Sequence, residues 1–144
     1  MYIQTRALLI TAILAWPSLA LAVDSEPLAR VEAGFAAYEK GGAQAAITEW
    51  VKGSPMEGSK EALSQANLMA QIEVFYGPFQ GHSVVQTKQL SASTQILYAT
   101  FDYQQGPAFA YFLLYRQPGK GWIIPQFKFH TDFVQVWPAS VYSD

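Results

Sequence analysis

A histidine close to a carboxylate is the first feature of this sequence that suggests chemistry. His130 lies two residues from both Lys128 and Asp132 in the segment WIIPQFKFHTDF. An imidazole beside a carboxylate can act as a general acid or base when a water-poor cleft tunes its pKa. The same three residues, on one face of a strand, equally form a solvated strip of balanced charge. Because adjacency alone does not show a tuned pKa, we predict the solvated strip and no catalytic role for His130 and Asp132.

Asp102, with either Tyr98 or Tyr111, is a second carboxylate and phenol combination of the acid–base type. The residues that most other kinds of active site require are absent from the sequence. The chain has no cysteine, which excludes a thiol nucleophile, and its two histidines lie far apart with no carboxylates at ligand spacing. A Gly-x-Ser-x-Gly segment for a serine hydrolase is also absent. We therefore predict no catalytic residue, no metal and no cofactor.

Two glycines bracket Pro78 and Phe79 in the segment YGPFQGHSVV. The Gly-Lys-Ser ending of a phosphate-binding loop is missing, so the segment does not predict a nucleotide site. Glycine and proline here are typical of a helix end and a turn into a strand, and this places His82 near the start of that strand.

Apolar residues at helical spacing predict three helices in the first half of the chain. Ser25 is the expected N-cap of the first, which Gly41-Gly42 ends. A short helix over residues 43–51 follows. Ser59 is the expected cap of the third helix, which runs to the Gly77-Pro78 break. The stripe that the third helix would bury is Leu63, Ala66, Met69, Ile72 and Tyr76.

After that break the pattern alternates, which is typical of strands joined by short turns. Four strands are predicted, over residues 82–90, 95–103, 108–117 and 121–134. Helices first and strands afterwards indicate an α+β fold, in which N-terminal helices pack on one face of a curved four-stranded antiparallel sheet.

The N-terminus predicts export. Arg6 precedes an uncharged apolar run that ends at Ala20-Leu21-Ala22, so residues 1–22 are expected to be a signal peptide and residues 23–144 a single domain. The alternative is a membrane anchor, but Pro17 and Ser18 leave an apolar core shorter than the roughly 20 residues that a spanning helix needs. We expect a periplasmic or secreted protein with no membrane span after cleavage.

Loss of Arg6 leaves 8 basic and 11 acidic residues, a net charge of −3, which argues against binding to nucleic acid.

The last predicted strand separates an apolar face from a more polar one. The set expected to face the core is Ile123, Pro125, Phe127, Phe129, Thr131 and Phe133. The set expected to face outward is Trp122, Ile124, Gln126, Lys128, His130 and Asp132.

The two middle strands are apolar on both faces, as in QILYATFDY and FAYFLLY. Helices can cover only one face of such a sheet, so the other must be covered by something else. A second copy of the chain, forming a homodimer sheet against sheet, is one solution. The segment VWPASVY folding back over the sheet is the other.

The chain resembles the nuclear transport factor two-like and ketosteroid isomerase-like superfamily in its order of helices followed by a four-strand meander. The segments that carry the resemblance are YEKGGAQAAITEW and GWIIPQFKF. The resemblance spans most of residues 26–134. It implies the cystatin-like, cone-shaped fold and a tendency to pair. It also implies an isomerase model, with a carboxylate base and a tyrosine donor inside the cone, but no aspartate or glutamate of this chain matches that base.

We therefore expect a non-enzymatic exported domain that binds a small apolar ligand in the cone, because ligand pockets are mostly apolar. The competing interpretation of the same side chains is a filled core. An adaptor that acts through its sheet face is the alternative function, and an isomerase-like enzyme is the least favoured. The candidate lining of the cone is Phe35, Tyr38, Trp50, Met69, Phe101, Phe127 and Phe129.

Overall fold

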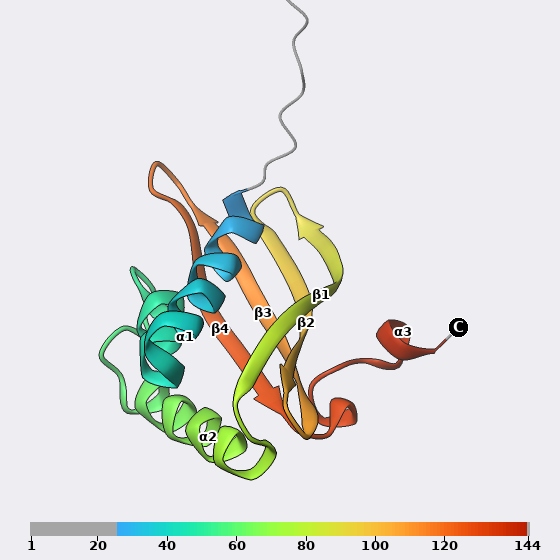
Figure 1. Ribbon diagram of the computed structural model, residues 1–144. Helices are drawn as coiled ribbons and strands as arrows, with labels where there is room; N and C mark the ends of the chain where they lie inside the picture. Colours follow the sequence, from blue (N-terminus) through green and yellow to red (C-terminus); the bar gives the residue numbers. More distant parts are fainter. Residues whose placement is uncertain (1–25, 144) are drawn as a thin grey trace, which may run out of the picture.

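Helices α1 and α2 lie over one face of a four-stranded antiparallel sheet (Figure 1), which confirms the α+β prediction. The computed structural model describes residues 26–143, so the predicted signal peptide, Ser25 and Asp144 lie outside the described residues. The sheet is an open, curved meander of order β1-β2-β3-β4. The elements are α1 (Glu26–Val51), α2 (Lys60–Tyr76), β1 (Phe79–Ser91), β2 (Thr94–Tyr103), β3 (Gly106–Gln117), β4 (Gly121–His130), η1 (Phe133–Gln135) and α3 (Ala139–Tyr142).

Helix α1 contains the break that the sequence predicts at Gly41-Gly42. Gly42 has φ 79° and ψ −169°, a conformation that glycine adopts without a steric penalty, and the two helical halves change direction there. The second half packs back on the first, and the Trp50 indole N–H donates to the carbonyl of Val31 at 2.8 Å. Gly34 leaves the space for this indole, because a Cβ at that position would lie 1.9 Å from Trp50 Nε1.

Helix α2 begins at the predicted cap, where the Ser59 hydroxyl accepts the N–H of Ala62 at 3.1 Å. The predicted stripe is correct in its centre and wrong at its start, since Leu63 is 54% exposed. It lies beside a pocket between α1 and α2, so no element covers it. The buried residues of this helix are Ala62, Ala66, Met69 and Ile72.

Strand β4 departs from the predicted alternation because of a β-bulge. Leu113 pairs with Gln126 and Tyr115 with Ile123, so that Ile124 and Pro125 together lie opposite a single residue of β3. One extra residue reverses which side chains face inward. The expected outward position of Trp122 and Ile124 is therefore wrong: both belong to the core cluster, with Phe127 and Phe129.

The strand also ends at His130, earlier than predicted, so Thr131 and Phe133 are not part of the inward face. Both lie in the C-terminal segment, residues 131–143, and Phe133 is an exposed residue of η1. His130 pairs with Phe109 at the end of the strand, on the face turned away from the helices.

The C-terminal segment folds back over this outer face of the sheet. Trp137 packs edge-on against Phe109, with ring centroids 5.0 Å apart, and its indole N–H donates to the carbonyl of Ala110 at 2.8 Å. Together with Val136 and Tyr98 it forms a second apolar cluster, separate from the core beneath the helices. Of the two covers that the doubly apolar strands predict, the folded-back segment is therefore present.

Candidate functional site

All seven side chains predicted to line the cone lie between the helices and the sheet, and none is more than 4% exposed. They belong to one apolar cluster and pack ring against ring. Trp50 lies 5.2 Å from Phe35 and 5.9 Å from Phe127 between ring centroids. Such mutual packing favours the filled-core interpretation, because protein interiors are close-packed. The members of this set are Phe35, Tyr38, Trp50, Met69, Phe101, Phe127 and Phe129.

At one end of the core, two tyrosines and a glutamate form a polar network that joins α1, α2 and β2. The Tyr38 hydroxyl donates to Glu73 Oε2 at 2.6 Å and lies 3.3 Å from the hydroxyl of Tyr103. Burial raises the pKa of Tyr103 to about 12. Burial, and then the hydrogen bond to Glu73, also raise the pKa of Tyr38. Both phenols therefore stay protonated at neutral pH, and the Tyr38 hydroxyl donates its hydrogen bond to Glu73.

His82 and Glu32 form a close, partly buried pair of ionisable groups. The His82 Nε2 lies 2.7 Å from Glu32 Oε2 on α1, and the His82 ring stacks on Phe35 with centroids 3.7 Å apart. The sequence places His82 near the start of a strand, which is correct, but does not reveal this partner, because 50 residues separate the two. Glu32 is three residues before Phe35, so helical spacing puts both on one side of α1.

The groups singled out for acid–base chemistry have structural roles at the end of β4. His130 Nδ1 accepts the backbone N–H of Asp132 at 2.9 Å, and Asp132 Oδ1 accepts the N–H of Val134 at 3.1 Å, which caps η1. These bonds hold the turn that leads into the C-terminal segment. Lys128 Nζ lies 3.4 Å from the carbonyl of Gln135 in the same segment, rather than pairing with Asp132.

The structure does not bring Asp102 close to Tyr98, its partner in the second acid–base combination. Tyr98 lies opposite Tyr111 across β2 and β3, whereas Asp102 lies opposite Pro107, four residues along β2 from Tyr98. At about 3.3 Å per strand residue, roughly 13 Å separates the Asp102 and Tyr98 positions. Burial, and then the nearby Tyr111, raise the pKa of Tyr98. Among residues 26–143, no group of three or more potential metal ligands gathers either.

The feature that remains is the outer face of the sheet. We call it the outer-face surface and define it by the apolar side chains of β2 and β3 that turn away from the helices, with the C-terminal residues packed on them. Trp137 covers the end at Phe109, where the neighbouring Tyr98 is only 6% exposed. The opposite end, at Tyr115, is 38% exposed. Its members are Ile96, Tyr98, Phe109, Tyr111, Leu113, Tyr115, Val136, Trp137 and Val141.

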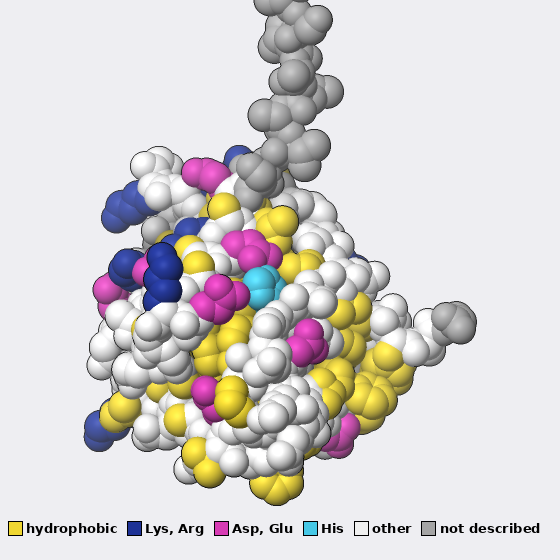
Figure 2. Space-filling model, in the orientation of Figure 1, with side chains coloured by type: hydrophobic (Ala, Val, Ile, Leu, Met, Phe, Trp, Pro, Cys, Tyr) yellow, Lys and Arg dark blue, Asp and Glu magenta, His cyan; other side chains and the backbone are white. Residues whose placement is uncertain are grey.

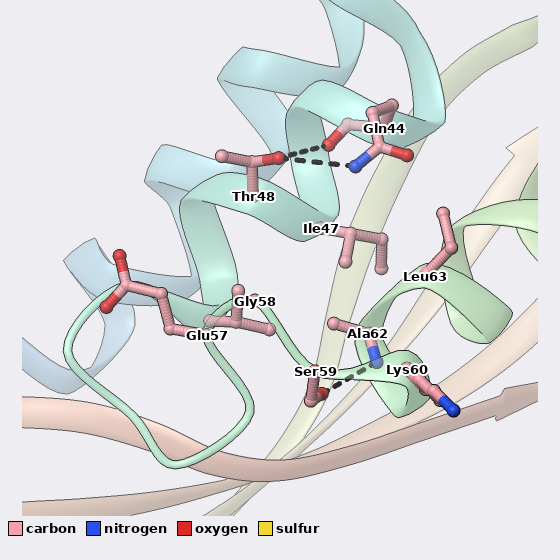
Figure 3. Close-up of a pocket in the computed structure, with 10 residues that line it drawn as sticks. Gln44, Ile47, Thr48, Glu57, Gly58, Ser59, Lys60, Ala62 and Leu63 are labelled. Atoms are coloured by element: carbon pink, nitrogen blue, oxygen red, sulfur yellow. Dashed lines mark hydrogen bonds between the residues drawn. The ribbon is translucent and has the colours of Figure 1, made fainter.

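A pocket of about 370 Å³ between the second half of α1 and the start of α2 is shown in Figure 3. Three of its polar side chains make hydrogen bonds to the backbone. Thr48 donates to the carbonyl of Gln44 at 2.8 Å, Ser59 caps α2, and Glu57 accepts the N–H of Gly53 at 2.9 Å.

No protein-family model, curated protein or solved structure matches the chain. The resemblance to the nuclear transport factor two-like and ketosteroid isomerase-like superfamily stays a prediction.

Proposed function

We propose that this protein is an exported, non-enzymatic interaction module that forms a homodimer through the outer-face surface. The observation that carries the proposal is that β2 and β3 are apolar on both faces. The C-terminal segment covers only part of their outer face. Ile96 and Leu113 are half-buried and Tyr115 is exposed at the uncovered end.

The covering segment adds apolar area of its own. Phe133, Val134 and Tyr142 are exposed, Val134 by 57%. Figure 2 shows apolar side chains gathered beside the C-terminal end of the chain. Contiguous exposed apolar area on a small domain is typical of an interface. A second copy of the chain is the occupant that we propose, because two-fold dimers are the commonest oligomers and pair the same surface of both subunits.

The non-enzymatic part of the proposal is supported by the structural hydrogen bonds that the candidate acid–base groups make. His130 and Asp132 are engaged in the turn after β4, and Tyr38 donates to Glu73. The order of helices and meander supports, as a further proposal, membership of the superfamily that the sequence resembles.

Export is proposed from the N-terminal sequence. Among the described residues, no helix combines the length and apolar character that crossing a membrane requires. Mass spectrometry of the exported protein should find a mature N-terminus at Val23, and a chain that still begins at Met1 would refute the proposed cleavage.

Light scattering on the mature chain tests the homodimer. We expect a dimer at micromolar concentration. Tyr115→Lys should weaken the association at least about a hundredfold, because burying an unpaired charge costs several kcal/mol. The matched control is Val74→Lys, a change of the same kind at a position of α2 that is 88% exposed, and it should leave the dimer intact. A natural chain that stays monomeric at every concentration would show that its own C-terminal segment is sufficient cover, and would refute the proposal.

A further inference from the structure

The C-terminal segment, residues 131–143, is anchored on the outer face of the sheet by Trp137. The indole ring packs edge-on against Phe109, with centroids 5.0 Å apart, and the indole N–H donates to the carbonyl of Ala110 at 2.8 Å. Tyr98 belongs to the same apolar cluster. We call this place the tryptophan recess and define it by Tyr98, Phe109 and Ala110. An apolar recess with one fixed acceptor is a typical anchor site for a tryptophan at an interface.

Little else attaches the segment to the sheet. Of residues 131–143, Val136 and Trp137 are buried, and neither η1 nor α3 contains a buried residue. Lys128 Nζ lies 3.4 Å from the carbonyl of Gln135 at an exposed position. Most of the other hydrogen bonds lie within the segment, such as that from the Trp137 N–H to the carbonyl of Phe133 at 2.7 Å. The segment can therefore leave the sheet as a unit while the helices and the four strands stay paired.

The segment also carries apolar side chains that no other element covers. Phe133, Val134 and Tyr142 are exposed, and the rings of Phe133 and Tyr142 pack against each other with centroids 4.7 Å apart. A segment that is apolar both at its anchor and on its exposed side is covered best when it lies between two chains, because apolar surface is then removed from water on both sides.

The segment is long enough for its anchor to reach a second copy. Thr131 and Trp137 are six positions apart, and a stretch of that length spans at most about 20 Å. Two sheets packed face to face lie about 10 Å apart. Where the outer faces of two chains meet, the tryptophan of one chain can therefore enter the recess of the other. Since the two recesses are identical, the exchange recreates the contacts of the anchor.

We propose that the tryptophan recess binds Trp137 of the partner subunit, so that the two chains of the homodimer exchange their C-terminal segments. The inference rests on the proposed homodimer and adds the residue that each chain supplies to the other. In a single chain the segment fills its own recess, and in the dimer it fills the recess of the partner. Exchange of an identical element is a low-cost route to a dimer, because the same contacts form within one chain or between two.

Isotope-filtered NMR on the natural sequence reads the exchange directly. Deuterated, ¹⁵N-labelled mature chain is mixed with an equal amount of unlabelled chain, and the mixture is unfolded and refolded in ordinary water so that mixed dimers form. An NOE from the Trp137 indole N–H of the labelled chain to the ring protons of Phe109 then arises only between chains, because the labelled chain has no ring protons. We expect this NOE at concentrations where light scattering shows a dimer.

Two variants test whether the recess accepts a segment from another chain. Trp137→Ala leaves the recess empty, and Phe109→Lys frees the segment by placing a charge where the indole rests. Their mixture restores the contact that each lacks, so it should associate at least about tenfold more tightly than either variant alone. The matched control mixes Trp137→Ala with Val74→Lys, whose own tryptophan already fills its own recess, and this mixture should show no such gain.

The outcomes separate the exchange from the homodimer on which it rests. A natural chain that stays monomeric refutes both. A dimer in which the Trp137 N–H gives no NOE to the partner's Phe109 refutes the exchange and leaves the homodimer, and so does a mixture of folded variants without the gain. The amide spectrum of each variant shows whether it is folded. If Phe109→Lys does not fold, the NOE in the natural chain decides alone.

Discussion

Replacing Gly34 by alanine should destabilise the protein, although alanine is the better helix former by about 1 kcal/mol. Gly34 lies in the first half of α1, where the Trp50 indole of the second half rests on it. An added Cβ would lie 1.9 Å from Nε1 and 2.2 Å from Cδ1 of Trp50. Both atoms belong to a rigid ring held on its other sides, with Phe112 at 4.9 Å and Phe35 at 5.2 Å between centroids. The indole must therefore move as a body.

Two costs follow from that movement. The N–H of Trp50 loses the carbonyl of Val31 and stays buried, which costs about 1–3 kcal/mol. Overpacking of the surrounding aromatic core costs a similar amount, about 1–3 kcal/mol. After the gain in helix propensity of about 1 kcal/mol, we expect Gly34→Ala to lower the free energy of unfolding by about 1–5 kcal/mol.

Urea denaturation of the mature chain, followed by circular dichroism, measures this change. The matched control is Trp50→Leu, because a smaller side chain leaves room for the Cβ. In that background Gly34→Ala should be neutral or stabilising by up to about 1 kcal/mol, so the two changes are strongly coupled. A Gly34→Ala variant as stable as the natural chain, or one equally destabilised with and without Trp50, would refute the packing of α1 on itself.

Two further changes separate a filled core and a structural histidine from their functional alternatives. Phe127→Ala should cost about 3–5 kcal/mol in urea denaturation if the cone is filled, and a much smaller cost would indicate an existing void. His130→Asn keeps an oxygen where Nδ1 accepts the N–H of Asp132, so the free energy of unfolding should change by no more than about 0.5 kcal/mol. A larger loss would mean that His130 does more than hold the turn.

Signals that lie within a few residues of one another were sufficient to predict most of the elements. Ser59 caps α2 because a serine hydroxyl can reach an N–H three residues later, and Gly42 breaks α1 because its backbone has no Cβ. The apolar residues on both faces of QILYATFDY and FAYFLLY predicted that both faces of β2 and β3 are covered, and the second apolar cluster covers part of the outer face. Inward placement of Phe127 and Phe129 was also correct, because alternation holds within an unbroken strand.

The error in the facing of β4 arises where one residue alters the period. The bulge at Pro125 reverses the facing of Trp122 and Ile124, and the sequence shows a proline there without showing whether the strand bulges. A bulge is defined by two residues lying opposite one on the neighbouring strand, so it depends on pairing with β3.

The sequence by itself therefore determined what local periodicity and capping control: the class of fold, the helix ends, the strand order and the need for a second cover. Only the tertiary structure decided which groups meet. Glu32 reaches His82, Trp50 rests on Gly34, and Trp137 covers part of the outer face. Each of these depends on contacts between segments far apart in the chain, whose geometry is set by the packing of the whole core and is not contained in the spacing of neighbouring residues.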